Sequence, residues 1–188
     1  MYPVYNCITR SSVILMNHIR MLWEQHAAWT RMAITSIVFG LPDEDSTVKR
    51  FLRNPTDFAH ALSPFYGNIV AAGFEKLLSE HLTIAAELVK AAKAGDSQKA
   101  ADIEKRWYKN ADDIAALLGS INPYWSEESW REMLHEHLVF VKAQAVSMLM
   151  KDYQKSVDTY DKMEIQILQM ADTMANGIIG QFAYYFCY

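Results

Sequence analysis

Apolar side chains recur every three or four positions over most of the sequence, and this periodicity restricts the fold more than any other feature. It runs through residues 11–39, 68–94, 97–119 and 126–150, and through a last segment that begins at 152. Such spacing places the apolar side chains on one face of a helix. Only seven glycines and five prolines occur among the 188 residues, most of them between these segments. That scarcity favours long helices over a sheet with many turns.

The five segments predict an all-α, antiparallel, up-and-down bundle of about five long helices. A chain of 188 residues is long enough to form its own core. We therefore expect one domain over residues 1–188, with 1–10 and 183–188 as loose ends. The expected architecture is ferritin-like or hemerythrin-like by analogy only.

Helix breakers and capping residues predict where the long helices begin and end. Gly40 ends the first helix, and Asp96, Ser126 and Asp152 have side chains that suit the start of the last three. Between the first two long helices, the sequence predicts two short segments. The first is a polar helix within residues 43–54, and the second is a turn or short helix over 54–67.

Charge and composition exclude several classes of function. The net charge is −4 with both signs interspersed, so no basic cluster is present to bind nucleic acid. The longest apolar stretches are about half the roughly 20 residues that a membrane span needs, and the start of the chain lacks a signal-peptide pattern. Two cysteines near opposite ends, Cys7 and Cys187, predict a reduced, cytoplasmic protein. No glycine-rich phosphate loop occurs, so we expect no nucleotide cofactor.

Three histidines lie on the apolar faces, where leucine is expected. They are His26, His81 and His137, and the last two belong to identical Glu-His-Leu triplets. The intervals between successive histidines are nearly equal, at 81 − 26 = 55 and 137 − 81 = 56 positions. Little else aligns beyond the triplets, so similar helix lengths explain the equal spacing better than a duplication does.

Distances along the helices place these histidines near the middle of the bundle. In an antiparallel pair of helices, residues equally far from the connecting turn stand at the same level. His81 precedes Gly95 by 95 − 81 = 14 positions, and Asn110 follows it by 110 − 95 = 15. His137 precedes Asp152 by 152 − 137 = 15 positions, and Glu164 follows it by 164 − 152 = 12, a mismatch of about one helical turn.

A buried layer of this kind needs partners, because a buried polar group without one costs about 1–3 kcal/mol. Three neutral imidazoles and one carboxylate suit a divalent transition metal such as zinc, iron or manganese. This hypothesis assigns His26, His81, His137 and Glu164 as ligands, with Asn110 behind them. A role in redox or oxygen chemistry would follow for iron with an open coordination position.

Two alternatives remain open from the residues alone. In the first, the layer is metal-free and fixes the register of the helices, and an apolar surface near the C-terminal tail supports a homodimer. In the second, the layer is a metal-free catalytic or ligand pocket. Neither the spacing nor the composition identifies a catalytic residue, so the sequence leaves open whether the protein is an enzyme.

Five stretches resemble a group of small uncharacterised bacterial proteins, chiefly from Gram-positive spore formers. They read "LWEQHAAWTR", "FLRNPTDFAHALSPFYG", "LLSEHLTIAAELVKAAKAGD", "RWYKNADDIAALL" and "INPYW". The resemblance covers residues 21–182. It implies a helical bundle, and it assigns no catalytic residue.

Overall fold

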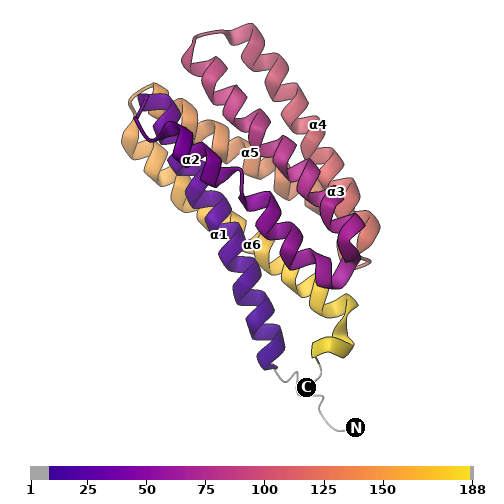
Figure 1. Ribbon diagram of the computed structural model, residues 1–188. Coiled ribbons are helices and arrows are strands. Elements are labelled where there is room, and N and C mark those ends of the chain that lie inside the picture. The colour runs from indigo at the N-terminus through magenta and orange to yellow at the C-terminus, as the bar shows by residue number, and fades with distance from the viewer. Residues whose placement is uncertain (1–8, 187–188) are drawn as a thin grey trace.

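The computed structural model describes residues 9–186, which form helices joined by turns and contain no strand. The elements are α1 (Arg10–Phe39), α2 (Glu44–Phe51), α3 (Asn54–Lys93), α4 (Ser97–Ile121), α5 (Glu127–Leu149), α6 (Tyr153–Gln181) and the 3₁₀ helix η1 (Ala183–Phe186). The prediction of an all-α bundle with five long helices is confirmed (Figure 1). Cys7 and Cys187 lie outside the described residues.

The predicted helix ends are confirmed by the capping contacts. Gly40 has the left-handed φ of 62° that ends α1. The side chains of Asp96, Ser126 and Asp152 each accept a hydrogen bond from the backbone N–H three residues later. These contacts satisfy N–H groups that a helix start otherwise leaves unpaired.

The two segments predicted over residues 54–67 and 68–94 are both helical and share the label α3, but the backbone between them is not helical. Pro64 lies inside α3, and Gly67 interrupts the helical backbone with φ 77° and ψ 166°. Glycine adopts this backbone conformation without the steric cost that other residues pay. The chain therefore kinks at Gly67, where the sequence predicts a break, and a second helical stretch continues to Lys93.

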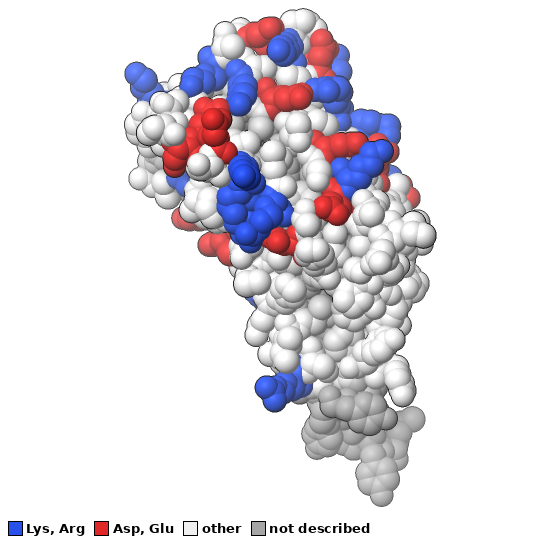
Figure 2. Space-filling model, in the orientation of Figure 1, with Lys and Arg blue, Asp and Glu red and all other residues white. Residues whose placement is uncertain are grey.

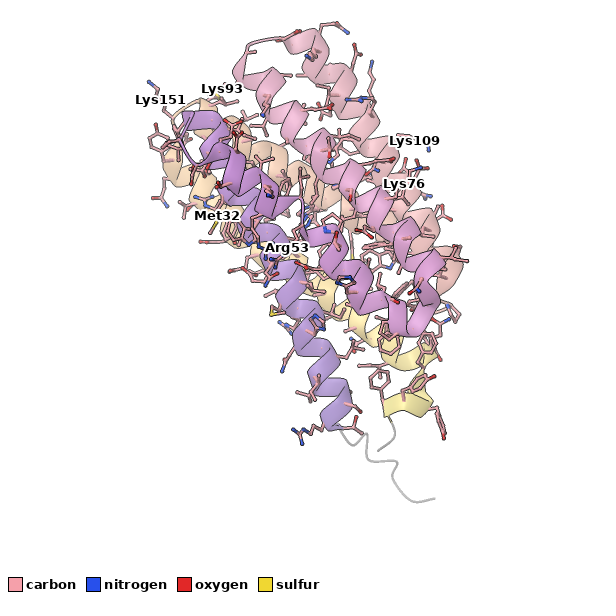
Figure 3. All side chains as sticks on the ribbon, in the orientation of Figure 1. Met32, Arg53, Lys76, Lys93, Lys109 and Lys151 are labelled. Atoms are coloured by element: carbon pink, nitrogen blue, oxygen red, sulfur yellow. The ribbon has the colours of Figure 1, made fainter. Side chains whose placement is uncertain are left out.

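The long helices surround one core. α1 packs against α3, α5 and α6, while α4 packs between α3 and α5, and α6 lies against α5. Apolar side chains from every long helix are buried in the core, including Ile19, Phe74, Leu118, Leu138 and Ile167. Charged side chains such as Lys76 and Lys109 point outward (Figure 3).

The two halves of the molecule differ in charge. Figure 2 shows Lys, Arg, Asp and Glu gathered over the half opposite the chain ends, whereas the other half is almost free of them. The sequence explains this pattern, since residues 58–74, 114–126 and 173–186 contain none of these four residue types. We call the part formed by residues 58–74, 114–126 and 173–186 the charge-free end. None of the helices in residues 9–186 is long and apolar enough to cross a membrane.

A polar network joins three segments at the charge-free end. Tyr66 on α3 donates its hydroxyl to Gln181 and accepts a hydrogen bond from Asn122, at 3.0 and 2.8 Å. Burial raises the pKa of Tyr66 to about 12, although the hydrogen bond from Asn122 opposes the shift. Phe186 of η1 stacks on Phe65 with ring centroids 6.0 Å apart. Within the expected loose end 183–188, Phe186 is thus buried, whereas Tyr184 and Tyr185 are exposed.

Candidate functional site

The three histidines on the apolar faces are buried, as predicted. His26 on α1, His81 on α3 and His137 on α5 are each only 2% exposed. The ring centroids of His26 and His137 lie 5.3 Å apart. His81 is near enough to both rings that a positive charge on one ring affects the pKa of another. Three helices thus bring one imidazole each to a common layer.

Asparagine side chains form hydrogen bonds with the rings of two of these histidines. His26 Nδ1 lies 3.1 Å from Asn54 Oδ1, and Asn54 Nδ2 donates to the carbonyl oxygen of Leu22 at 3.0 Å. His81 Nδ1 lies 2.8 Å from Asn110 Oδ1, and Asn110 Nδ2 donates to Leu77 O at 3.0 Å. In both cases the carbonyl belongs to the residue four positions before the histidine.

These contacts determine which ring nitrogen carries the proton. An amide nitrogen only donates, so its bond to the helix carbonyl leaves the amide oxygen facing the ring. The imidazole must then donate from Nδ1, and the neutral ring keeps a lone pair on Nε2. Both rings form these hydrogen bonds through Nδ1.

The third histidine has a related partner on α6. Gln166 Nε2 donates to Met133 O at 2.8 Å, and Met133 is again four residues before the histidine. Burial lowers the pKa of His137, and the side chain of Gln166 opposes this shift. The two groups nevertheless form no hydrogen bond, since His137 Nδ1 and Gln166 Oε1 are both buried without a partner.

We call each set a histidine–amide unit: a histidine, the carbonyl four residues before it, and an Asn or Gln from a following helix. The histidine precedes the amide residue by 54 − 26 = 28, 110 − 81 = 29 and 166 − 137 = 29 positions. The repetition is thus more extensive than the triplets and the histidine spacing indicated. It continues past the amides in a shared pattern of a large apolar residue followed by a buried alanine: Phe58-Ala59, Ile114-Ala115 and Met170-Ala171.

Burial keeps all three imidazoles neutral at physiological pH. It lowers the pKa of His26 to about 4, against the opposing hydrogen bond to Asn54. Burial and then repulsion from His26 lower the pKa of His81 to about 3. The pKa of His137 is lowered well below its usual value by burial and by the other two histidines. Neutral imidazole is the form that coordinates a metal ion.

Further polar atoms near the layer are buried without partners. The indole N–H groups of Trp23, Trp107 and Trp130 are among them, as are both amide atoms of Gln144 on α5. Trp23 lies against His26, and Trp107 lies against His81, with centroid distances of 5.6 and 5.3 Å. Buried polar groups normally have a protein, water or ion partner. The unpaired N–H groups of Trp23 and Trp107 thus belong to rings that lie beside His26 and His81.

Of the other expected site residues, Asn110 is in the layer and Glu164 is elsewhere. Glu164 is partly exposed, and its charge acts on Glu24 and Tyr160. Burial and then Glu164 raise the pKa of Glu24. Burial and the same two carboxylates raise the pKa of Tyr160 to about 12. Gln166, two residues later on α6, donates a hydrogen bond to the helix of His137.

Two members of the layer, Asn54 and Gln166, were not among the expected site residues. Asn54 directly precedes a proline, which suggested a helix end. The signal that identifies both residues is the separation of 28 or 29 positions from a buried histidine, already present between His81 and Asn110.

The described part of the chain contains no group of three or more His, Cys, Asp or Glu already placed to hold a metal ion. Comparisons with models of known protein families, with curated proteins and with solved structures gave no match. The resemblance to a group of bacterial helical bundles therefore stays a prediction.

Proposed function

We propose that the protein binds one divalent transition metal ion, iron, zinc or manganese, through Nε2 of His26, His81 and His137. The observation that carries this proposal is the contact of Nδ1 with an asparagine oxygen in His26 and His81, which leaves the lone pair of each neutral ring on Nε2. Metal-binding histidines commonly donate their other ring N–H to a neighbouring oxygen, which orients the ring. Asn54 and Asn110 supply that oxygen here.

The separation of the rings supports the proposal. Two imidazoles on one tetrahedral ion, with metal–nitrogen distances of about 2.0–2.1 Å, have centroids roughly 5 Å apart. The observed centroid distance between His26 and His137 is 5.3 Å. Because no ready-made site is present in the described residues, binding requires small rotations that turn the three Nε2 atoms toward one point. Three ligands leave at least one coordination position for water or substrate, and with iron this would permit redox or oxygen chemistry.

Glu164 was expected as the fourth ligand. For that role it would have to leave the neighbourhood of Glu24 and Tyr160, where its charge raises the pKa of both. We therefore base the proposal on the three imidazoles alone.

Metal titration of the purified, metal-free protein tests the proposal. We expect Zn²⁺ and Co²⁺ to bind with one equivalent, and His81→Ala or His137→Ala to weaken binding at least tenfold. His135→Ala is the matched control, because His135 shares α5 with His137 but contacts Asp112 at the surface, at 2.8 Å. Folding of each variant is checked by circular dichroism. A folded wild-type protein that takes up no metal would refute the proposal.

A second candidate function is a metal-free interaction protein whose histidine–amide units fix helix register. The amide-to-carbonyl bonds favour it, because each one joins two helices at a single level. The bond between His81 and Asn110, which stand almost equally far from Gly95 along the chain, also supports the proposed antiparallel arrangement. The ferritin-like or hemerythrin-like analogy and a cytoplasmic location remain predictions of the sequence.

In this second function, two copies would associate through the charge-free end. Ile69 is 91% exposed there, and three tyrosines are exposed as well: Tyr124, Tyr184 and Tyr185. Interfaces are enriched in tyrosine and depleted in lysine and glutamate. The chain has a net charge of −4, and residues 58–74, 114–126 and 173–186 contribute no charged side chain that would repel a second copy.

A further inference from the structure

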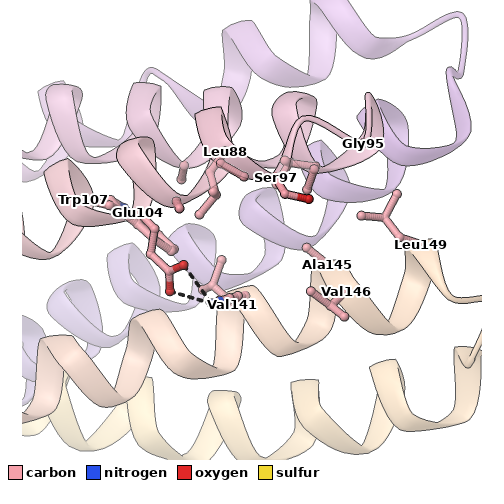
Figure 4. Close-up of a pocket in the computed structure, with 15 residues that line it drawn as sticks. Leu88, Gly95, Ser97, Glu104, Trp107, Val141, Ala145, Val146 and Leu149 are labelled. Carbon is pink, nitrogen blue, oxygen red and sulfur yellow. Dashed lines mark hydrogen bonds and ion pairs between the residues drawn. The ribbon is translucent and has the colours of Figure 1, made fainter.

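A cavity of about 370 Å³ lies between α3, α4 and α5, close to the turn at Gly95 (Figure 4). Small side chains from all three helices produce it: Ala85, Ala92, Ala100, Ala101 and Ala145. Larger side chains at these positions would fill the space, since protein cores are normally closely packed. Its volume falls in the range of about 300–1,000 Å³ that is usual for small-molecule sites.

The walls of this cavity carry no unpaired charge. Leucine and valine side chains supplement the alanines, and Glu104 and Lys142 are the only charged residues among those that line it. Lys142 Nζ donates to both carboxylate oxygens of Glu104, at 2.6 and 2.8 Å, as the dashed lines in Figure 4 show. A charged ligand would have to break this pair, whereas an uncharged one leaves it intact.

The inner end of the cavity is close to the histidine layer. Trp107 lines the cavity, and its ring also lies 5.3 Å from that of His81. Ala85 and Val141, which also line it, follow His81 and His137 by four residues, one helical turn. A second space of about 10 Å³ is bordered by Ala85, Val141 and Thr30, the residues one turn after each of the three histidines.

We propose that this cavity binds a small, uncharged, mainly hydrocarbon molecule beside the histidine layer. Burial of the apolar surface of such a molecule supplies the driving force, about 25 cal/mol per Å². Engineered cavities of about 150 Å³ already bind benzene. The binding step needs no metal. If the histidines hold a metal ion as proposed above, the cavity places the bound molecule one helical turn from it, in the position of a substrate.

The test uses N-phenyl-1-naphthylamine, an uncharged probe whose fluorescence rises in apolar surroundings, on the metal-free full-length protein. We expect saturable binding with one equivalent. Ala92→Leu, which fills the cavity from α3, is expected to weaken binding at least tenfold. Ala72→Leu, at an exposed alanine of the same helix, should leave the affinity unchanged. Ala145→Leu fills the cavity from α5 and provides a second variant if Ala92→Leu does not fold.

Two further measurements separate the possible explanations. His81→Ala is expected to keep the binding of the uncharged probe, so failure of metal binding and failure of this proposal are distinguishable. The anionic probe 1-anilinonaphthalene-8-sulfonate should bind at least tenfold more weakly than the uncharged one. Equal affinity for both probes would overturn the assigned ligand class. Absence of saturable binding, or unchanged affinity in both filling variants, would overturn the site itself.

Discussion

His81 Nδ1 lies 2.8 Å from Asn110 Oδ1, while the amide nitrogen of Asn110 donates to the carbonyl of Leu77 on the histidine's own helix. The asparagine therefore bonds two groups on α3 that are one turn apart. This arrangement fixes the proton on Nδ1 and fixes α4 relative to α3. One residue thus serves both the orientation of the imidazole and the packing of two helices.

Replacement of Asn110 tests this double role. Asn110→Ala leaves His81 Nδ1–H buried without an acceptor, so we expect a loss of about 1–3 kcal/mol in the free energy of unfolding. Urea denaturation measures it. Asn68→Ala is the control, because Asn68 is exposed and bonds only Ser63, and its effect should stay within about 0.5 kcal/mol. Equal effects of the two substitutions would contradict the role of Asn110.

Stability should depend on pH because the three histidines are buried neutral. The unfolded chain takes up protons near pH 6.5, whereas folded His26 and His81 do so only near pH 4 and 3. The unfolded state therefore binds more protons between these values, and stability is full above about pH 6.5. It falls as the pH drops, by about 1.4 kcal/mol per pH unit for each such histidine. Urea denaturation at pH 7, 6 and 5 measures the slope. A flat profile would show that the imidazoles are not buried in neutral form.

Close packing at the charge-free end predicts a strong effect at Gly177. A Cβ atom there would stand 1.8 Å from Trp125 Nε1, which donates to Thr173 O at 3.1 Å. Gly177→Ala should destabilise the protein by about 3 kcal/mol or more. At Gly73, also helical, a Cβ atom would meet nothing within 4 Å, so Gly73→Ala should stabilise by about 0.5–1 kcal/mol. Thermal unfolding of the pair gives the comparison, and similar melting temperatures would argue against the close contact at Trp125.

If two copies associate through the charge-free end, the measured mass of the protein should depend on its concentration. In light scattering coupled to gel filtration, the wild type should approach the mass of two copies as its concentration rises. Ile69→Lys places a charge at an apolar side chain that is 91% exposed. This substitution should shift the measured mass toward that of one copy. Thr83→Lys, at an exposed position of the same helix, controls for the added charge. A wild-type protein with the mass of one copy at every concentration would rule out the dimer.

The sequence predicted the long helices and most of the histidine layer because periodicity and distance along a regular helix are local properties. Counting from Gly95 placed His81 and Asn110 at one level, and they are hydrogen-bonded. The same count from Asp152 fits Gln166, at 166 − 152 = 14 positions, better than Glu164, at 164 − 152 = 12. The chemistry of metal ligands favours the carboxylate, whereas the distance along the helix favours the amide.

Asn54 was harder to predict, because α2 and its two turns separate it from His26. No distance along a single pair of helices relates these two residues. The orientation of the rings and the cavity beside Trp107 depend on packing between three helices, which periodicity does not specify.

The repetition of the histidine–amide units also bears on how the chain folds. Each unit joins residues only 28 or 29 positions apart, so three pairs of neighbouring segments can form early with small losses of chain entropy. Arg20 and Asp172, which bond α1 to α6, are 152 positions apart. Closing a loop of that length costs about 1.5 kcal/mol more than closing the loop of one histidine–amide unit. Contacts between distant segments generally slow folding. We therefore expect the packing of α1 against α6 to limit the folding rate, after the three histidine–amide units have formed.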